Sequence, residues 1–129
     1  MSFITTLTGQ NVFLNTIINS DIFLLHLYSN DRIPSKTDVI GNYTEVAFLG
    51  YAAKLLTPSE WVIAIDGLTG NYVATFPQQV FTFSGIVQTF GYYITDHGGT
   101  QLILAERFPT APIILSQGNI KIVPIFLAS

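Results

Sequence analysis

The chain has 129 residues, of which 49% are apolar and 10% charged, and its formal net charge is −3. One ordinary domain fits this length, and the composition excludes a disordered chain, which needs low hydrophobicity and high charge. Five basic residues against eight acidic ones leave no basic stripe, so we expect no nucleic-acid partner. The lack of cysteine excludes disulfide frameworks, thiolate catalysis and cysteine-based zinc sites.

The scarcity of charge predicts an obligate oligomer. A compact monomer of this mass exposes roughly 6,800 Å² of surface, which these few charged side chains would have to cover. Large uncharged or apolar patches usually mark interaction sites, although a surface rich in Thr, Asn, Ser and Gln would also explain the composition. No apolar run reaches about 18 residues, so we expect no membrane-spanning helix and no membrane partner.

Residues 1–20 form the first compositional unit, and their side chains carry no charge. Several apolar residues lie near helical spacing: Phe3, Leu7, Leu14 and Ile18. The runs 12–14 and 16–18 fit extended segments equally well, and periodicity cannot decide so short a case. The segment lacks the basic n-region of a secretory signal, so we expect it in the mature protein. An uncharged apolar segment needs a cover, either its own core or a neighbouring subunit, and we predict an apolar N-terminal arm that reaches another subunit.

From residue 21 onward the pattern is typical of β structure. Apolar or alternating runs separated by turn residues predict strands at 23–28, 51–56, 61–65, 72–75, 80–83, 87–95, 101–108, 113–115 and 120–127. A further short strand is possible at 45–48, the strand at 61–65 is apolar on both faces, and Gly-rich turns at 66–71 and 96–99 predict hairpins. We therefore predict an all-β, single-domain antiparallel β-sandwich over residues 21–129, of the jelly-roll or immunoglobulin-like kind.

The two histidines do not predict a catalytic or metal site. His26 lies between Leu25 and Leu27 in an apolar run, which favours a buried histidine with satisfied nitrogens over a metal ligand, because zinc needs three or four ligands. His97 follows Asp96 in a Gly-rich turn, and no Gly-x-Ser-x-Gly nucleophile motif accompanies this pair. We predict no metal and no cofactor.

The carboxylates and aromatic residues also favour a structural role. Glycoside hydrolysis needs an opposed carboxylate pair, but the candidates are scattered: Glu45, Glu60, Asp66 and Glu106. Some aromatic residues could form a carbohydrate platform: Trp61, Tyr72, Phe90, Tyr92 and Tyr93. Large aromatic residues are more often core or interface anchors, so we predict that Trp61 and Phe90 are structural and that the protein is not an enzyme.

Several short motifs, in this order and spacing, resemble small virion structural proteins of tailed bacteriophages. They lie at 25–31 with Pro34 after them, at 50–52, 81–83, 91–96 and 104–108, and at the closing 118–124. The resemblance covers about residues 22–127 and implies a β-sandwich that coats or cements a capsid as a homotrimer. The family pattern carries no catalytic residue, and the N-terminal segment departs from it most.

The resemblance and the low charge lead to one functional hypothesis, a cement or decoration protein on the capsid surface of the virion that binds the major capsid protein. Multivalent binding suits this role, as does a closed symmetric oligomer. The candidate interface residues are Phe3, Leu7, Phe13, Leu14, Ile18, Tyr92 and Arg107. The alternative is a tail, baseplate or fibre component, which exposed aromatic residues around the loops 66–71 and 96–99 would favour. An enzyme or lectin acting on polysaccharide is a third class, which paired carboxylates in a groove would favour.

Overall fold

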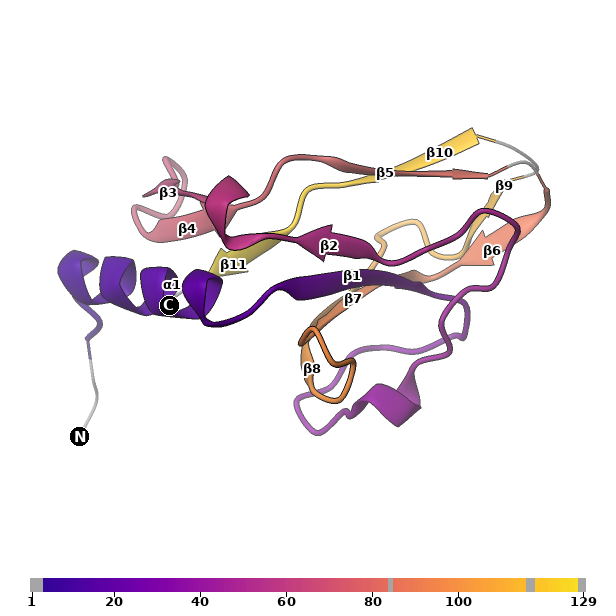
Figure 1. Ribbon diagram of the computed structural model, residues 1–129, viewed down its shortest axis with the longest axis horizontal. Helices are drawn as coiled ribbons and strands as arrows, with labels where there is room; N and C mark the ends of the chain where they lie inside the picture. The colour runs from indigo at the N-terminus through magenta and orange to yellow at the C-terminus, as the bar shows by residue number, and fades with distance from the viewer. Residues whose placement is uncertain (1–3, 84, 116–117, 128–129) are drawn as a thin grey trace. The chain divides into compact units, whose positions relative to one another are not determined.

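The computed structural model describes residues 4–83, 85–115 and 118–127, and it is mostly β structure with one α-helix (Figure 1). Every strand pair whose register is described is antiparallel, so the predicted all-β sandwich class is confirmed. The chain forms two compact units: unit 1 comprises residues 1–22, 57–79 and 122–129, and unit 2 comprises residues 23–56 and 80–121.

Each unit combines segments that are far apart in the sequence. Unit 1 contains α1 (Leu7–Ser20), η2 (Pro58–Glu60), β3 (Val62–Ile65), β4 (Tyr72–Thr75) and β11 (Ile125–Leu127). Unit 2 contains β1 (Phe23–Tyr28), η1 (Ile40–Asn42), β2 (Lys54–Leu56), β6 (Val87–Thr89), β7 (Gly91–Thr95), β8 (Leu102–Arg107) and β9 (Ile113–Leu115). It also holds nearly all of the strand pair β5 (Gln79–Phe83) and β10 (Gly118–Ile122).

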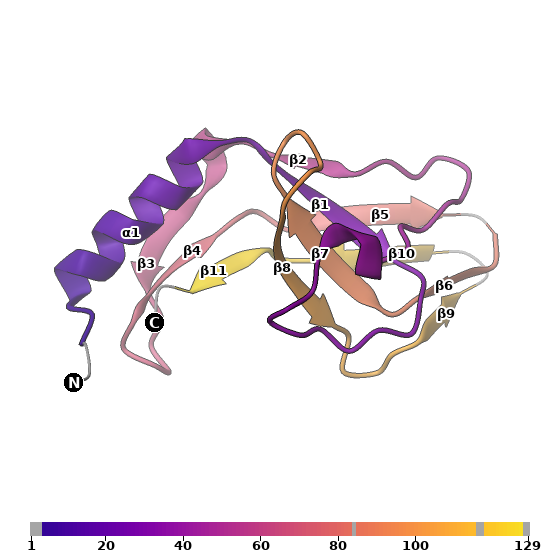
Figure 2. The same cartoon turned by 90° about the horizontal axis from the view of Figure 1, so that it is seen from below.

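Helix α1 begins at Thr6, whose side-chain hydroxyl accepts a hydrogen bond from the Gly9 N–H at 3.1 Å. Such an N-cap satisfies one of the free N–H groups at the start of a helix. Residues spaced four apart on one side of the helix are buried: Gln10, Leu14 and Ile18. The helix lies alongside β3 and β4, and it contacts both strands and η2 (Figure 2).

The predicted N-terminal arm is not confirmed, because its described part is a helix packed within unit 1. Leu14 and Ile18 are 0% and 5% exposed. The Gln10 side chain joins the helix to the β3–β4 hairpin: its amide donates to Asn71 Oδ1, and its carbonyl accepts from the Tyr72 N–H, both at 2.8 Å. Burial of one helix face and this pair of bonds give the segment a partner inside its own chain.

The sheet of unit 1 has the order β11-β4-β3. The predicted hairpin loop joins β3 to β4. In it the Asp66 N–H donates to the Asn71 carbonyl, and the Gly70 N–H donates to the Asp66 carbonyl, both at 2.8 Å. Alternate residues on one side of the sheet are buried or partly buried: Trp61, Ile63, Ala74 and Phe126. The register places six residues on the opposite side, which we call the outer sheet face: Val62, Ala64, Val73, Thr75, Ile125 and Leu127.

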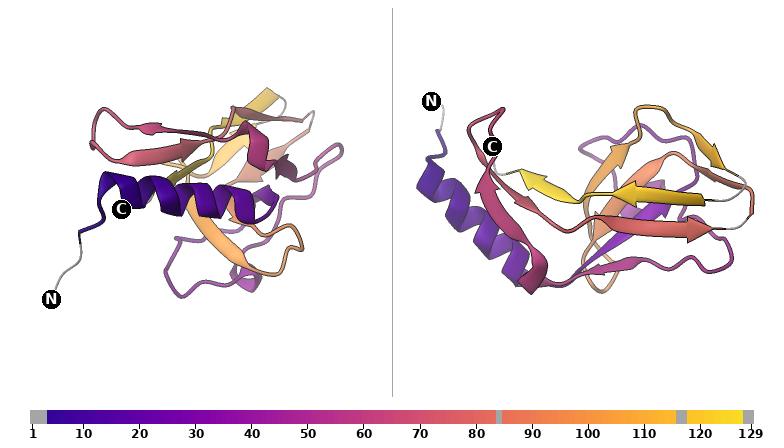
Figure 3. Two further views of the ribbon diagram at one scale, coloured as in Figure 1. Left: turned by 60° about the vertical axis from the view of Figure 1, so that its left-hand side comes forward. Right: turned by 90° about the horizontal axis from the view of Figure 1, so that it is seen from above.

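Unit 2 is built on the sheet β2-β1-β7-β8, and β5 and β10 run side by side as a separate pair (Figure 3). Successive residues of a strand point to opposite faces. On one face Leu25, Leu27 and Ile94 are completely buried. On the other face Tyr28 and Tyr93 pack with Tyr43 from the loop between β1 and β2. Burial on both faces explains why β1 and β7 read as apolar runs rather than alternating ones.

Two predicted strands are each divided in the structure because the chain changes partners. The segment 87–95 divides at Phe90, where β6 pairs with β9 and β7 pairs with β1 and β8. The segment 120–127 divides at Val123 and Pro124, so that β10 pairs with β5 and β11 with β4. Proline has no N–H for a ladder bond. The possible strand at 45–48 is only a single bridge between Glu45 and Tyr28.

The buried carboxylate of Asp38 holds the loop between β1 and β2, and it predicts how the stability of the fold depends on pH in acid. Asp38 pairs with Arg32 and accepts hydrogen bonds from the Tyr43 hydroxyl at 2.7 Å and the Ser35 N–H at 3.1 Å. The hydrogen bonds from Arg32 and then from Tyr43 lower the pKa of Asp38 to about 2.

Because the folded-state pKa of Asp38 lies below the usual value of 3.8, the carboxylate stabilises the fold above that value. We expect this contribution to be lost as the pH falls from 3.8 toward 2. Urea denaturation midpoints measured over this pH range should therefore fall less steeply for Asp38→Asn than for the native chain. Equal slopes in the two proteins would contradict the assignment.

Candidate functional site

The first candidate site is a cluster around His26, in the middle of β1. Its Nδ1 lies 2.6 Å from Glu45 Oε2, and its Nε2 lies 2.8 Å from Thr95 Oγ1 on β7. The imidazole stacks on the Tyr93 ring with centroids 4.6 Å apart. Both ring nitrogens therefore have partners, as predicted for a buried histidine.

Tyr51 completes this cluster from the segment that precedes β2. Its hydroxyl donates to Glu45 Oε2 at 2.6 Å and accepts from the Leu27 N–H at 3.1 Å. Burial, followed by the hydrogen bond to Glu45, raises the pKa of Tyr51 above its usual value. The Tyr51 hydroxyl thus satisfies the Leu27 N–H of β1, which in a longer sheet would donate to a neighbouring strand.

The order Thr95, His26, Glu45 is that of a nucleophile, a base and an orienting acid. Its geometry does not suit that chemistry, because Thr95 is 1% exposed and its hydroxyl donates to the Asp96 carbonyl at 3.0 Å. The hydroxyl proton is thus directed away from the imidazole that would have to accept it. In this arrangement the three side chains tie β1, β7 and the loop before β2 together.

The other carboxylates considered in the sequence lie in separate contacts. Glu106 accepts from the Tyr92 hydroxyl at 2.7 Å, and burial, followed by this bond, raises the pKa of Tyr92. Asp66 accepts from the Thr69 hydroxyl within its own hairpin loop. Asp96 accepts from the backbone of residues 100 and 101 in the turn that also holds His97. Among the described residues, no three His, Asp or Glu side chains lie together as a metal-binding group.

The predicted interface residues fall into three groups. Leu7 and Phe13 are 46% and 54% exposed on α1, where a partner could contact them. Four others are engaged within the chain: Leu14, Ile18, Tyr92 and Arg107. Phe3 lies outside the described residues. The role of these residues in an interface stays a prediction. Of the predicted residues on α1, Leu7 and Phe13 are exposed to a partner, and Leu14 and Ile18 are not.

The aromatic residues considered for a carbohydrate platform are mostly buried. Trp61 and Phe90 are each 7% exposed, so both rings lie in the interior, where a structural role would place them. Trp61 stacks on Phe126 with centroids 4.8 Å apart, and Arg107 lies over the Phe90 ring at 5.2 Å. Arg107 also donates to Asp31 at 2.7 Å. These contacts hold the two rings in their units.

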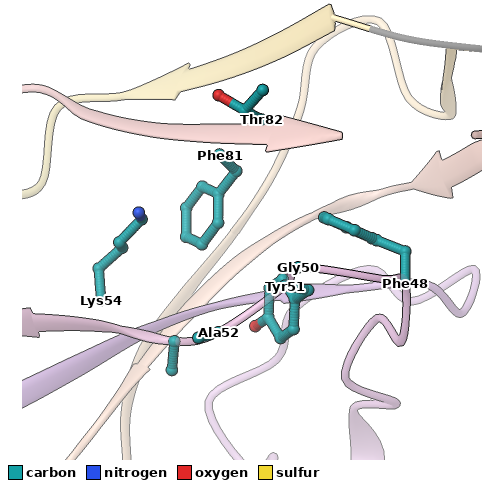
Figure 4. Close-up of a pocket in the computed structure, with 8 residues that line it drawn as sticks. Phe48, Gly50, Tyr51, Ala52, Lys54, Phe81 and Thr82 are labelled. Carbon is teal, nitrogen blue, oxygen red and sulfur yellow. The ribbon is translucent and has the colours of Figure 1, made fainter. Parts of the chain in front are cut away.

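Sequence reasoning missed a pocket in unit 2, between the segment preceding β2 and strand β5 (Figure 4). Its walls include the rings of Phe48, Tyr51 and Phe81, and Lys54 lies at its side with Nζ 5.4 Å from the centroid of the Phe81 ring. Tyr51 and Phe81 stack with centroids 5.8 Å apart. The lone cation in an otherwise apolar stretch, Tyr51–Leu56, is the sequence signal that could have indicated it.

The second candidate site is the outer sheet face of unit 1, which carries no charged residue. Val62, Ile125 and Leu127 are 62%, 43% and 69% exposed there. The whole of unit 1 has only three charged side chains, the carboxylates of Asp21, Glu60 and Asp66, whereas all five Lys and Arg residues lie in unit 2. An exposed apolar surface of this kind usually marks an interaction site.

Comparison of the chain with protein-family models, with curated proteins and with solved structures finds no match. In the part of the chain that the structure describes, no helix has both the length and the apolar character needed to cross a membrane.

Proposed function

We propose that the protein is a non-enzymatic structural protein of a tailed-phage virion, a cement or decoration protein that bridges major capsid subunits. The observation that carries the proposal is the uncharged, apolar outer sheet face. A β-sheet in water normally alternates apolar and polar residues, with the polar ones toward solvent. Here the solvent side carries Val62, Ile125 and Leu127 instead.

Burying such side chains gives a gain of roughly 25 cal/mol per Å² of apolar area, so a neighbouring chain that covers this face stabilises the assembly. Leu7 and Phe13 of α1 are further exposed apolar side chains of the same unit. A cement protein makes many such contacts at once, and multivalency multiplies modest pairwise affinities. The resemblance of the motifs at 25–31, 91–96 and 104–108 to phage virion proteins supports the particle as the setting.

The alternative, a tail or fibre component with a receptor-binding loop, gains no support from the two hairpin loops. Among the described residues of the segments 66–71 and 96–99, none is Phe, Trp or Tyr. The most exposed apolar side chain there is Leu68, at 96%. We therefore retain the capsid position as the proposal.

The decisive experiment locates the protein in the particle. Purified chain is added to virions that lack it, and electron microscopy records where it binds, while DNA release on heating records the stability of the shell. We expect ordered density on the capsid surface and release at a higher temperature. Density confined to the tail, or no binding to any virion, would overturn the capsid proposal.

The free protein is expected to be a trimer at micromolar concentration in neutral buffer, because the exposed apolar surface of unit 1 favours association. Sedimentation equilibrium measures this directly. Leu127→Lys should weaken association by introducing an unpaired charge on the outer sheet face. Ile33→Lys is the matched control, since Ile33 is 76% exposed in unit 2. A well-behaved native monomer would contradict the expectation.

A further inference from the structure

Lys54 differs from the other cations of the chain. Arg32 pairs with Asp38, and Arg107 pairs with Asp31. The other two lysines, Lys36 and Lys121, are exposed to solvent. Lys54 is partly buried, and in the described residues its ammonium group has no carboxylate partner, only the face of a phenylalanine ring. This partly buried ammonium group is therefore available to a carboxylate from outside the chain.

The pocket beside Lys54 has the size of one side chain. Its volume is about 90 Å³, whereas ligand pockets typically measure about 300–1,000 Å³. Its aromatic walls are held by ring contacts, Phe48 on Tyr51 at 5.2 Å and Tyr51 on Phe81 at 5.8 Å. Figure 4 shows the Lys54 side chain directed toward the Phe81 ring. A carboxylate with an aliphatic stem suits this setting, since the stem would contact the rings and the charge would meet the ammonium group.

Unit 1 supplies carboxylates but contains no Lys or Arg residue. Asp66 is engaged by Thr69 in its loop, and Asp21 Oδ1 accepts from the Ile22 N–H. Glu60 is exposed on η2 and accepts a hydrogen bond from the Thr57 hydroxyl at 2.6 Å. Of the three carboxylates, Glu60 is thus the most accessible to a neighbouring chain.

We propose that the Lys54 pocket receives the Glu60 side chain of a second copy of this chain, so that unit 2 of one copy binds unit 1 of the next. This inference rests on the proposed oligomer, and it specifies the contact. Such a contact joins two different surfaces, and contacts of this type close into rings when the rotation permits. A ring of three copies would contain three Lys54–Glu60 pairs.

Charge reversal tests the contact on the full-length protein. Lys54→Glu and Glu60→Lys are each expected to weaken association about a hundredfold, because each places like charges against one another. The double variant, Lys54→Glu with Glu60→Lys, should restore association to within about tenfold of the native chain. Sedimentation equilibrium measures association, and circular dichroism with thermal unfolding establishes that each variant is folded. If the Lys54→Glu variant does not fold, Glu60→Lys, on an exposed position, still decides the question.

Lys121→Glu is the matched control, because it reverses an exposed lysine of the same unit and should leave association unchanged. Carbodiimide cross-linking of mixed light and ¹⁵N-labelled chains should join Lys54 of one copy to Glu60 of another in peptides of mixed label. A native monomer, single variants that associate normally, or a double variant that fails to recover would overturn the inference. Because these measurements use the pure protein, they stand apart from the virion experiment: association through this pair without capsid binding would refute the cement function alone.

Discussion

Gly91→Ala is expected to destabilise the fold by about 3 kcal/mol, the upper end of the usual cost of overpacking, because the strand has no space for a methyl group at this position. Gly91 lies in β7 opposite Arg107 of β8 and Tyr28 of β1. A Cβ atom there would overlap the backbone carbonyl oxygen of Glu106 and lie 2.7 Å from the Tyr28 ring. Neither neighbour can move freely, since the first belongs to a paired strand and the second is completely buried.

Gly41→Ala is the control, because no atom lies within 4 Å of a Cβ built on Gly41. Its cost should stay within about 0.5 kcal/mol. Urea denaturation followed by circular dichroism compares the two variants with the native chain. Equal midpoints for Gly91→Ala and the native protein would show that the β1-β7-β8 packing is looser than described.

Trp61→Ala is expected to lower the free energy of unfolding by about 3–5 kcal/mol, the usual cost of removing a large buried ring. The indole is 7% exposed, stacks on Phe126 and meets the Phe76 ring edge-on at 5.1 Å. Its removal would leave a cavity between the start of β3 and strand β11. The loss of stability should therefore affect the whole of unit 1.

Trp61→Phe separates the ring contacts from the indole nitrogen. Trp61 Nε1 is buried with no hydrogen-bond partner among the described residues, so replacing the indole by a phenyl ring removes no hydrogen bond. This variant should lose less than half of the stability that the alanine variant loses. Circular dichroism is the suitable probe, since both variants lack the single tryptophan. A Trp61→Ala variant as stable as the native chain would contradict a structural role.

The strands that the sequence predicted correctly are those defined by local signals. The hairpin of β3 and β4 follows from the turn residues Asp66–Asn71, and that of β7 and β8 from the turn at 96–99. The break at Phe90 had no such signal, because it arises where the Phe90 N–H bonds to the carbonyl of Tyr28, far away in the sequence. Long-range partner choice of this kind cannot be seen in a local pattern.

The sequence of helix α1 does not by itself distinguish helix from strand, for a related reason. Its sequence has helical spacing in one set of residues and strand-forming runs in another, and the sheet of unit 1 decides between them by covering Leu14 and Ile18. The capping role of Thr6 was a usable signal. The prediction of an arm over 1–20 that reaches another subunit rests on the lack of charge in this segment, and a lack of charge fits an apolar interior equally well.

The candidate sites depended on contacts between distant residues. Glu45 and Thr95 lie 19 and 69 positions from His26, so no motif could join them. The Lys54 pocket brings together the segment preceding β2 and strand β5, which no spacing rule connects. The outer sheet face, by contrast, could be anticipated in part, because the apolar character of both faces of 61–65 is visible in the sequence.

The uncharged outer sheet face has a consequence for how temperature acts on the protein. Association that covers apolar side chains is driven near room temperature by the entropy of released water, and this driving force weakens on cooling. Chains joined through Val62, Ile125 and Leu127 would therefore separate in the cold and rejoin on warming. Salts such as sulfate, which are excluded from protein surfaces, would oppose that separation.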